Sequence, residues 1–527
     1  RVTKQQTTKK DFLFILLIIT ILSISLLSFP LILYAASKYG PGSTHDSVAY
    51  MYAAESLLKG DGLVYFGYDS PFVQWPPMYP FVLAIVKILC GDIPTGVKYL
   101  NCILFSLIIF LSGYWLYKKT ESPLISILGS ISVLISIPLV YVSKYIWSEP
   151  LFILFVLLFM IFIDDFLCGL SLKHLILGAL FAALSFLTRY VGAIAIITGC
   201  ILLLLRNGKI GRKIGETFIF GIISTLPTIL WMIRNYLLVN TFTGGRNPAE
   251  STLKENMDMA FATIASWFAP DYSASLVYIM LILILLISII LIVFNLIIKK
   301  DKSEGYRTSI PLIFSIAYIV YLLVSASIAD FDSINSRLMS PVFVPIIITA
   351  LFTMHSFIMF IGGEKNNKKS KIKIIIMECV CTLMFFVWII NPLSSIIEDV
   401  KCSHEKGAGI LSSDWWVNSE IINYVKNLPN SKKIYSNIPD AIYIHTGRKA
   451  YFTPKKEGLA IYGLDKFKET IENEGSAYIV WFNSDIIDDI YNVYDLENFF
   501  LLNEIEEFST GTICEISGLR GIYSESN

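Results

Sequence analysis

The sequence predicts a polytopic α-helical membrane protein of about 11 transmembrane helices, followed by a C-terminal extracytoplasmic α/β domain. Three observations predict it. Of the 527 residues, 55% are hydrophobic and only 16% are charged, whereas soluble domains average about 45–50% and 25%. Long apolar runs recur along the chain, and the last part of the chain has mixed polarity. This composition excludes a disordered chain and argues against a soluble enzyme. The net charge of zero leaves no basic excess for binding nucleic acid.

A transmembrane helix needs about 20 mostly apolar residues. Nine runs meet this requirement, at 12–34, 97–117, 124–143, 147–166, 216–236, 275–298, 309–328, 338–361 and 372–391. A tenth apolar stretch, 174–205, is longer and contains Arg189. We interpret it as two short helices that meet at Leu187-Thr188-Arg189-Tyr190, which brings the expected number of spans to eleven.

Lysine and arginine are concentrated in alternate loops between these runs, for example at 118–119, 206–213, 299–302 and 365–373. Because cytoplasmic loops carry the positive charge, the N-terminus is expected in the cytoplasm. We therefore predict a transmembrane domain over 1–391, with outer loops at about 35–96 and 237–274, and an extracytoplasmic domain over 392–527. The absence of any N-glycosylation sequon favours a bacterial or archaeal cell membrane.

The last 135 or so residues alternate two kinds of segment, which suggests the small α/β domain. Trp415–Leu428 and Leu464–Asn473 are helix-like, whereas Lys433–Tyr435, Ala477–Phe482 and Gly511–Ile516 are short apolar runs typical of strands. The eight cysteines lie mostly in apolar runs without a C-x-x-C pair, so we interpret them as packing residues and not as zinc ligands.

The first outer loop contains an acid at the start of a predicted helix. Ser43 and Asp46 fit a capping box, and Gly60 suits the end of that helix. Asp46 is therefore either a capping carboxylate or a catalytic base outside the bilayer, and the two roles are compatible. A helix N-terminus favours the ionised carboxylate that a base needs. Glu55, two to three turns later, is expected to be solvated.

Four arginines map to outer ends or outer loops, where arginine should be scarce: Arg189, Arg234, Arg246 and Arg337. A membrane-embedded arginine costs roughly 2.5–3.5 kcal/mol, so a partner must offset the cost. An anionic lipid phosphate suits the guanidinium group, which offers paired hydrogen bonds. The alternative for Arg189 is snorkelling to the interface, or an ion pair with Glu149.

Other residues give weaker indications. His45 lies beside Asp46, but one histidine and one carboxylate do not make a metal site. The proline-rich corner of residues 74–80 contains Trp75 and Tyr79, which suit an interfacial aromatic belt or a sugar-stacking surface.

Together these motifs resemble the type C glycosyltransferase superfamily, most of all the branch with protein O-mannosyltransferases, lipid A aminoarabinose transferases and their bacterial and archaeal relatives. The resemblance covers roughly residues 11–350. It rests on Asp46 followed by Tyr50-x-Tyr52-Ala53-Ala54-x-x-Leu57-Leu58-x-Gly60-x-Gly62, on Pro76-Pro77-x-Tyr79-Pro80, on Trp147-Ser148-Glu149-Pro150-Leu151, on Leu187-Thr188-Arg189-Tyr190-Val191-Gly192, and on Arg234-Asn235-Tyr236 with Thr243-Gly244.

The resemblance implies transfer of a hexose or pentose from a polyprenyl-phosphate carrier to an acceptor hydroxyl outside the cytoplasm, usually with inversion. The acceptor class is a protein, a glycolipid or a glycan. Asp46 would be the general base, the arginines would hold the donor phosphate, and His45, Tyr50, Glu149, Trp75 and Tyr79 would support the substrates. Many relatives carry two adjacent acids where this sequence has Asp46-Ser47, so the sequence gives no support for a second carboxylate role or for a divalent metal. The donor substrate that the resemblance implies is the polyprenyl-phosphate-linked sugar.

Two other classes remain open. A lipid flippase or secondary transporter would be expected to show repeated halves and broken helices at mid-membrane, and no repeat is visible in the sequence. A non-catalytic envelope assembly protein would tolerate the loss of Asp46.

Overall fold

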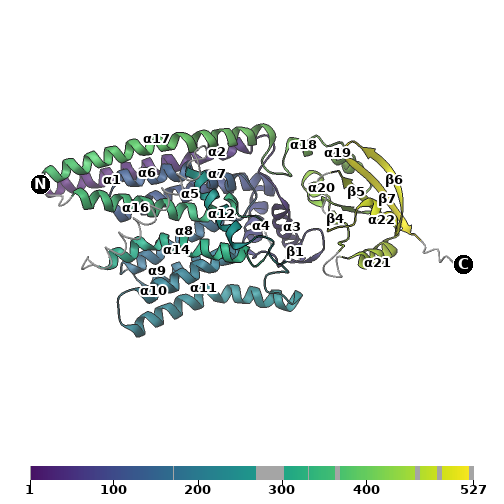
Figure 1. Cartoon of the computed structure of the whole chain (residues 1–527), viewed down its shortest axis with the longest axis horizontal. Coiled ribbons are helices and arrows are strands. Elements are labelled where there is room, and N and C mark those ends of the chain that lie inside the picture. The colour runs from purple at the N-terminus through teal and green to yellow at the C-terminus, as the bar shows by residue number, and fades with distance from the viewer. Residues whose placement is uncertain are drawn as a thin grey trace. The chain divides into compact units, whose positions relative to one another are not determined.

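The computed structural model describes residues 2–169, 171–268, 302–329, 332–362, 368–456, 463–483 and 489–520. The chain divides into two compact units (Figure 1). The helical unit contains Arg1–Ser37 and Val73–His404, and the α/β unit contains Lys38–Phe72 and Glu405–Asn527. Each unit is described by itself below.

The helical unit is built almost entirely from apolar helices. In chain order they are α1 (Val2–Leu26), α2 (Ser28–Ala35), α4 (Met78–Cys90), α5 (Ile93–Thr120), α6 (Pro123–Leu134), α7 (Ile137–Ser143), α8 (Glu149–Leu167), α9 (Leu172–Thr188), η1 (Tyr190–Gly192), α10 (Ala193–Leu205), α11 (Ile210–Val239), α12 (Leu253–Phe268), α14 (Lys302–Ala326), α15 (Ser336–Met339), η2 (Ser340–Val342), α16 (Phe343–Gly362) and α17 (Lys368–Lys406).

Among the described residues, seven helical segments are long and apolar enough to cross a membrane, and eight if α6 and α7, bent by 50°, form one span. The chain is therefore a multi-pass membrane protein. The stretch predicted as two short helices is indeed broken, since α9 and α10 flank η1 at Tyr190–Gly192. Helices α9 and α10 are shorter than the seven candidate membrane spans. The predicted run 275–298 lies outside the described residues. The expected number of eleven spans therefore stays a prediction.

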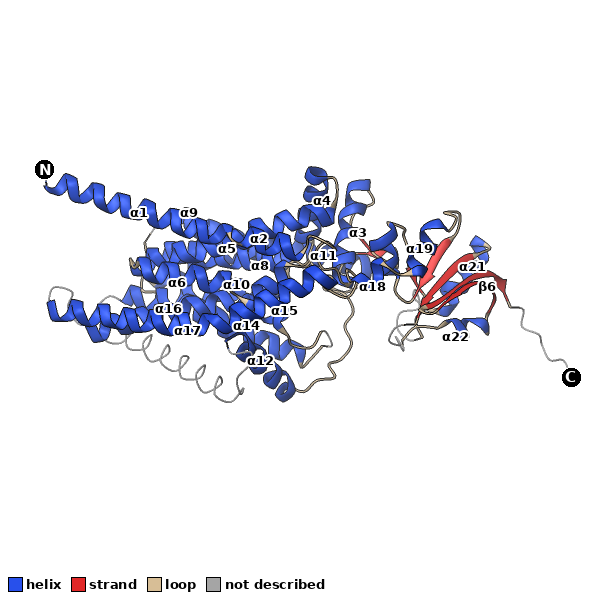
Figure 2. Cartoon of the chain, turned by 90° about the horizontal axis from the view of Figure 1, so that it is seen from above, coloured by secondary structure: helices blue, strands red, loops and turns tan. Residues whose placement is uncertain are grey.

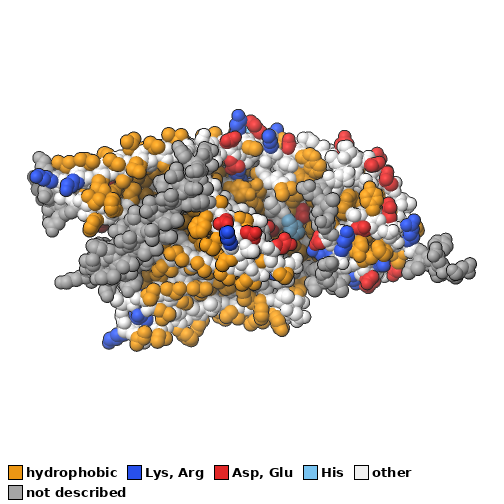
Figure 3. Space-filling model, in the orientation of Figure 1, with side chains coloured by type: hydrophobic (Ala, Val, Ile, Leu, Met, Phe, Trp, Pro, Cys, Tyr) orange, Lys and Arg blue, Asp and Glu red, His pale blue; other side chains and the backbone are white. Residues whose placement is uncertain are grey.

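Apolar side chains on the outside of the helical unit fit contact with lipid. Figure 3 shows them spread over much of the coloured part of this unit's surface. Only 6% of the apolar window of α17 is buried, whereas 78% of that of α8 is buried. Helix α8 thus lies in the middle of the helices, and α17 lies at their periphery.

The α/β unit is organised around a five-stranded mixed sheet with the order β4-β3-β5-β7-β6 (Figure 2). The strands are β3 (Lys433–Ser436), β4 (Tyr451–Phe452), β5 (Ala477–Phe482), β6 (Phe500–Phe508) and β7 (Gly511–Leu519). Strands β3 and β4 and strands β3 and β5 pair in parallel, whereas β7 is antiparallel to both β5 and β6.

Helices cover both faces of this sheet. Phe467 of α21 (Leu464–Glu474) and Leu496 of α22 (Val493–Glu497) join a core with Tyr435 and Ile479. On the other face, α18 (Asp414–Val417) brings Trp416 against Phe482. Helices α19 (Glu420–Asn427) and α20 (Pro439–Thr446) complete the unit.

The α/β unit includes a segment from near the start of the chain. This segment contains α3 (His45–Lys59) and a two-stranded ribbon of β1 (Val64–Tyr65) and β2 (Ser70–Pro71). The backbone NH of Leu411 donates to the carbonyl of Ser43 at 3.2 Å. The predicted division of the chain at 391/392 stays a prediction, but the loop that carries Asp46 packs with residues after 405.

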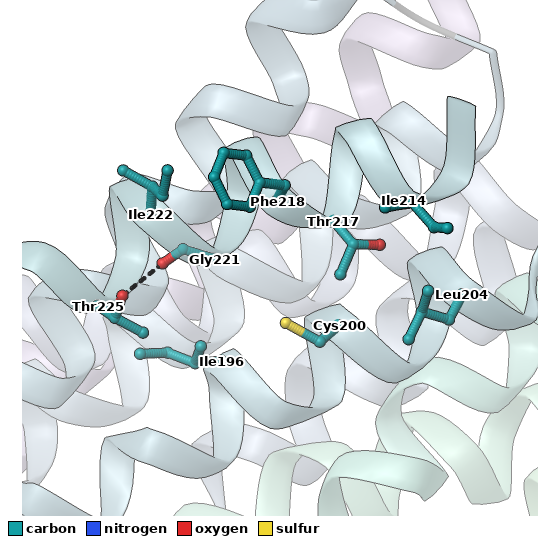
Figure 4. Close-up of a pocket in the computed structure, with 9 residues that line it drawn as sticks. All are labelled: Ile196, Cys200, Leu204, Ile214, Thr217, Phe218, Gly221, Ile222 and Thr225. Carbon is teal, nitrogen blue, oxygen red and sulfur yellow. Dashed lines mark hydrogen bonds between the residues drawn. The ribbon is translucent and has the colours of Figure 1, made fainter. Parts of the chain in front are cut away.

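A groove of about 420 Å³ lies between α10 and α11 (Figure 4). Its lining is mostly apolar, and it contains none of the residues that the sequence analysis selected: Ile196, Cys200, Leu204, Ile214, Thr217, Phe218, Gly221, Ile222 and Thr225.

Candidate functional site

A buried carboxylate bound to two guanidinium groups lies at the N-terminal end of α8. Oε1 of Glu149 accepts hydrogen bonds from Nη1 of Arg189 at 2.6 Å and from Nε of Arg337 at 2.7 Å. The Glu149 side chain is 0% exposed, and those of Arg189 and Arg337 are 16% and 8% exposed. We call these three residues the Glu149 cluster.

The residues just before Glu149 bind the same two arginines. The Arg337 guanidinium lies over the Trp147 ring at 4.2 Å from its centroid, and Arg189 donates to the Ser148 hydroxyl at 3.1 Å. Pro150 suits the first turn of α8, where no backbone NH is needed. Glu149 is the first residue of the helix, so its side chain lies at the positive end of the helix dipole. Three consecutive side chains, 147–149, therefore form one binding surface for two cations.

Arg337 is held in place by a very short helix. Asn335 caps α15 by accepting hydrogen bonds from the backbone NH of Arg337 at 2.9 Å and of Leu338 at 3.2 Å. Trp267 of α12 donates to Ser336, and Tyr318 of α14 donates to the Leu338 carbonyl. These bonds fix the backbone on both sides of Arg337.

Arg189 occupies the break between α9 and α10. It ends α9 in an extended conformation, and the chain then makes the single turn η1. Gly192 closes this turn so tightly that a Cβ atom there would lie 2.4 Å from the backbone nitrogen of Phe186. The break thus requires glycine at 192, and it directs Arg189 toward Glu149.

Tyr190, the next residue, organises a second group of side chains. Its hydroxyl donates to the Val73 carbonyl at 2.9 Å and accepts from Trp231 at 3.1 Å and Asn235 at 3.3 Å. Arg234 stacks on Trp231 at 4.5 Å and donates to the Asn235 side chain at 3.0 Å. The break in 174–205 therefore joins two clusters, one through Arg189 and one through Tyr190.

Arg246 and Trp75 lie in the loops near this second group. Arg246 is exposed, and its Nη2 is 3.5 Å from the carbonyl of Gln74. Trp75 is half-buried. Arg234 and Arg246 thus contact Trp231, Asn235 and Gln74, which are not members of the Glu149 cluster.

The buried part of the Glu149 cluster holds two guanidinium groups on one carboxylate. A second acidic partner, Asp332, lies 3.4 Å from Arg337 but is 63% exposed. Two neighbouring guanidinium groups suit an oxyanion with several acceptor oxygens, such as a phosphate ester.

At the other end of α8, Asp164 and Asp165 pair with Lys119 and Lys118. Fifteen residues of helix separate Glu149 from Asp164, which is about 22 Å at 1.5 Å per residue. The charged groups of α8 therefore lie at its two ends, and the apolar part of the helix lies between them. The Glu149 cluster is at one end of a helix that nearly spans a bilayer core of about 30 Å.

Asp46 lies in the first turn of α3, in the α/β unit. The predicted capping box is displaced by one residue. Thr44, and not Ser43, is the N-cap, and the box partner is Ser47, which accepts from the Thr44 backbone NH at 3.1 Å. Asp46 therefore occupies the second helical position and not the third, so the reciprocal capping role predicted for it belongs to Ser47. The helix ends at Gly60, as predicted.

His45 forms an ion pair across the α/β unit. Its Nδ1 lies 3.0 Å and 3.1 Å from the two carboxylate oxygens of Asp440, and its Nε2 lies 2.7 Å from the Tyr65 hydroxyl. Burial lowers the pKa of His45, but the charge and hydrogen bond of Asp440, with the charge of Asp46, outweigh it and raise this pKa to about 9. His45 is therefore a cation at neutral pH, which makes it unsuited to bind a metal ion. No group of three or more His, Cys, Asp or Glu side chains gathers as metal ligands in the described part of the chain.

The aromatic candidates differ in exposure. Tyr50 and Tyr79 are both 0% exposed and pack in their units, Tyr50 against Phe72. Glu55, expected to be solvated, instead interacts with Tyr443, whose pKa is raised by burial and then by the charge and hydrogen bond of Glu55. The prediction for Glu55 was wrong because its partner lies on α20, far along the chain.

Sequence reasoning missed two members of these clusters. Tyr190 was part of a recognised motif, but its bonds to Trp231 and Asn235 had no signal in the sequence. Asp440, the partner of His45, is 395 positions away and lies in a segment without a recognised motif.

No protein-family model matches the sequence, and no curated protein matches it. Several solved structures match the fold of the chain. ArnT from Cupriavidus metallidurans in the apo state superposes with a TM-score of 0.59 at 11% identity, over 96% of this chain and 98% of that chain. The same protein bound to undecaprenyl phosphate gives a TM-score of 0.61 at 9% identity, over 95% and 97%. The oligosaccharyltransferase AglB from Archaeoglobus fulgidus, in complex with an inhibitory peptide and a dolichol-phosphate, gives 0.54 at 12% identity, over 88% and 69%.

These similarities extend over nearly the whole chain and show its fold. The predicted resemblance to the type C glycosyltransferase superfamily is confirmed at this level, since the chain has the fold of that superfamily.

Proposed function

We propose that the protein is a membrane glycosyltransferase that moves a hexose or pentose from a polyprenyl-phosphate carrier to an acceptor hydroxyl on the extracytoplasmic side of a bacterial or archaeal cell membrane. The observation that carries the proposal is the fold, which the chain shares over 95% of its length with a structure of ArnT that contains undecaprenyl phosphate. The buried pair of arginines on Glu149 supports the donor class, because a phosphate headgroup needs such cations.

In this proposal Arg189 and Arg337 bind the phosphate of the donor, assisted by Arg234 and Arg246. A sugar phosphate ester has a good leaving group when cations stabilise the departing phosphate, so no general acid is needed. The polyprenyl tail stays in the lipid, and the reacting end is at the membrane surface.

Asp46 removes the proton from the acceptor hydroxyl. The acceptor oxygen attacks the anomeric carbon, the bond between this carbon and the phosphate oxygen breaks, and polyprenyl phosphate leaves with both electrons of that bond. A positioned carboxylate base contributes about 10²–10⁴-fold to such a step. The second position of α3 favours the ionised form of Asp46 through the helix dipole.

The two substrates are supported by His45, Tyr50, Glu149, Trp75 and Tyr79. The C-terminal extracytoplasmic region selects a protein, glycolipid or glycan acceptor.

The donor class is tested with the full-length protein in lipid nanodiscs and undecaprenyl phosphate as the probe, by native mass spectrometry. Arg189→Ala is expected to weaken binding at least about tenfold, because a lost charge-assisted hydrogen bond is worth about 1.5–3 kcal/mol. Arg212→Ala is the matched control, since Arg212 is 72% exposed and pairs with Glu216 near the start of α11. Equal affinities of all three proteins would refute the assignment of the phosphate.

The base is tested by complementation. Cells that lack the gene are given wild-type protein or Asp46→Asn, and their envelope glycans are compared by mass spectrometry. We expect the wild-type protein to restore one glycan and the variant to restore none, while the variant still binds undecaprenyl phosphate. Restoration by Asp46→Asn excludes Asp46 as the base. A flippase would be indicated instead if the deletion strain accumulated the lipid-linked sugar on the cytoplasmic side of the membrane.

A further inference from the structure

His45 is an unusual residue for the first position of a helix. It precedes Asp46 directly, and the N-terminus of α3 carries the positive end of the helix dipole. A cationic imidazolium there is opposed by the helix dipole, so its presence requires an anion nearby. Asp440 is that anion, with both carboxylate oxygens within 3.1 Å of Nδ1.

Asp440 also lies at the start of a helix. It is in the first turn of α20, directly after Pro439, and its side chain is 8% exposed. The positive end of the α20 dipole therefore lies next to the Asp440 carboxylate. The ion pair joins the N-terminal turns of two helices that are far apart in the sequence.

We propose that Asp440 is a positioning residue for the general base: by holding His45, it fixes the first turn of α3 and thereby the carboxylate of Asp46. The inference rests on the function proposed above, in which Asp46 takes the acceptor proton. Asp440 does not touch the reacting atoms and acts only through its neighbour.

Other contacts within the α/β unit hold the chain on either side of this turn. The Leu411 NH donates to the Ser43 carbonyl at 3.2 Å, and the Ser412 hydroxyl donates to the Pro41 carbonyl at 3.0 Å. After α3 in the sequence, between β1 and β2, the Asp69 carboxylate accepts hydrogen bonds from Lys449 at 2.5 Å and from the Tyr451 hydroxyl at 3.1 Å. These contacts anchor the segment as a whole, whereas Asp440 is the partner that acts at the first turn.

The groups that face His45 come from four elements. Asp440 approaches from α20, the Tyr65 hydroxyl from β1, and the Phe452 ring from β4 at 5.8 Å. Asp46 lies on the same helix, and the positive charge of Lys455, just after β4, is the opposing influence. The balance raises the pKa of His45 to about 9, so the ion pair persists at neutral pH and is lost in alkaline solution.

Hydrogen exchange of the full-length protein in nanodiscs tests the proposal without a substrate. In Asp440→Asn at pH 7, the backbone amides of a peptide covering 44–50 are expected to exchange at least tenfold faster than in the wild-type protein. Asp440→Glu is expected to restore protection. Peptides from β5 should be unchanged in both variants, which shows that the unit remains folded. Unchanged exchange at 44–50 in Asp440→Asn overturns the proposal.

Should Asp440→Asn fail to fold, His45→Gln decides. This variant removes the imidazole ring that Asp440 binds and leaves Asp440 in place, so the proposal expects faster exchange confined to the same turn. Exchange at the wild-type rate in that variant overturns it.

Turnover is measured with undecaprenyl-phosphate hexoses and pentoses as donors, and by complementation in cells. Asp440→Asn should lower kcat at least tenfold with an unchanged KM for the donor, and Asp440→Glu should recover most of it. The wild-type rate should fall above about pH 9, and in Asp440→Asn the fall should move to lower pH. If Asp440→Asn had a normal kcat and pH profile while Asp46→Asn was inactive, the positioning role of Asp440 would be overturned and the base role of Asp46 would stand. An active Asp46→Asn would overturn the proposed base itself.

Discussion

Nε of Arg337 donates a hydrogen bond to Oε1 of Glu149 at 2.7 Å, although 188 positions of sequence separate the two residues. The same oxygen accepts from Arg189. A single buried carboxylate thus brings together two arginines that lie on separate elements of the helical unit. The arrangement makes Glu149 responsible both for the stability of this region and for the placing of its two cations.

Glu149→Gln is expected to destabilise the protein by about 3–5 kcal/mol, because it removes the buried carboxylate that the Arg189 and Arg337 guanidinium groups share. The measurement is thermal unfolding of the full-length protein in detergent. Undecaprenyl phosphate should recover more stability in the variant than in the wild-type protein, since a ligand that binds only the folded state stabilises it.

The control for this variant is Glu250→Gln, whose side chain is exposed in the loop after α11. A surface change of this kind usually alters stability by less than about 0.5 kcal/mol. Equal unfolding temperatures for Glu149→Gln and Glu250→Gln would show that Glu149 does not compensate the arginines.

Arg337→Lys keeps the charge but loses the planar guanidinium group that both bonds Glu149 and stacks on Trp147. We expect the affinity for undecaprenyl phosphate to fall about 10- to 100-fold, which corresponds to one charge-assisted hydrogen bond. Native mass spectrometry gives the affinity, and Arg212→Lys on the same assay should match the wild-type protein. An unchanged affinity in Arg337→Lys would mean that charge alone, and not geometry, is required.

Much of the helical unit could be predicted from the sequence, because a span is a local property. A run of apolar residues must be a helix in lipid, since all backbone groups need partners within the segment. Arg189 interrupted such a run, and the structure has its break there. The ion pair with Glu149 was one of the three explanations offered for this arginine, and it is present.

The register of α3, strand β6 and the long-range ion pairs could not be predicted, because they depend on information that is not local in the sequence. Thr44 and Ser43 both carry a hydroxyl that can cap a helix, so sequence alone could not decide the register of α3. Strand β6 was not predicted, because Glu504, Glu506 and Glu507 obscure its alternation at the edge of the sheet. The partners Asp440 and Arg337 are brought to His45 and Glu149 by the fold alone.

Gly192→Ala should disturb the turn that directs Arg189 and Tyr190. Its Cβ would lie 2.4 Å from the backbone of Phe186, so the backbone must move. Such overpacking costs about 1–3 kcal/mol, and we expect weaker undecaprenyl phosphate binding together with a lower unfolding temperature. The matched control is Gly215→Ala in α11, where nothing lies within 4 Å of the new methyl group. This control should gain about 0.4–1 kcal/mol, and an equal gain in Gly192→Ala would contradict the tight turn.

The ion pair of His45 with Asp440 should make the stability of the α/β unit depend on pH. The pKa of His45 is raised from 6.5 to about 9, with burial opposing the shift and Asp440 and Asp46 causing it. Because the folded state binds the proton more tightly, the added stability is complete below pH 6.5, declines between pH 6.5 and 9, and is absent above pH 9. We expect the difference in urea unfolding between the wild-type protein and Asp440→Asn to follow this course. Asp489→Asn, which removes a partly exposed pair with Lys455, should give a difference that is constant from pH 6.5 to 9. A constant difference for Asp440→Asn as well would show that His45 is not held as a cation.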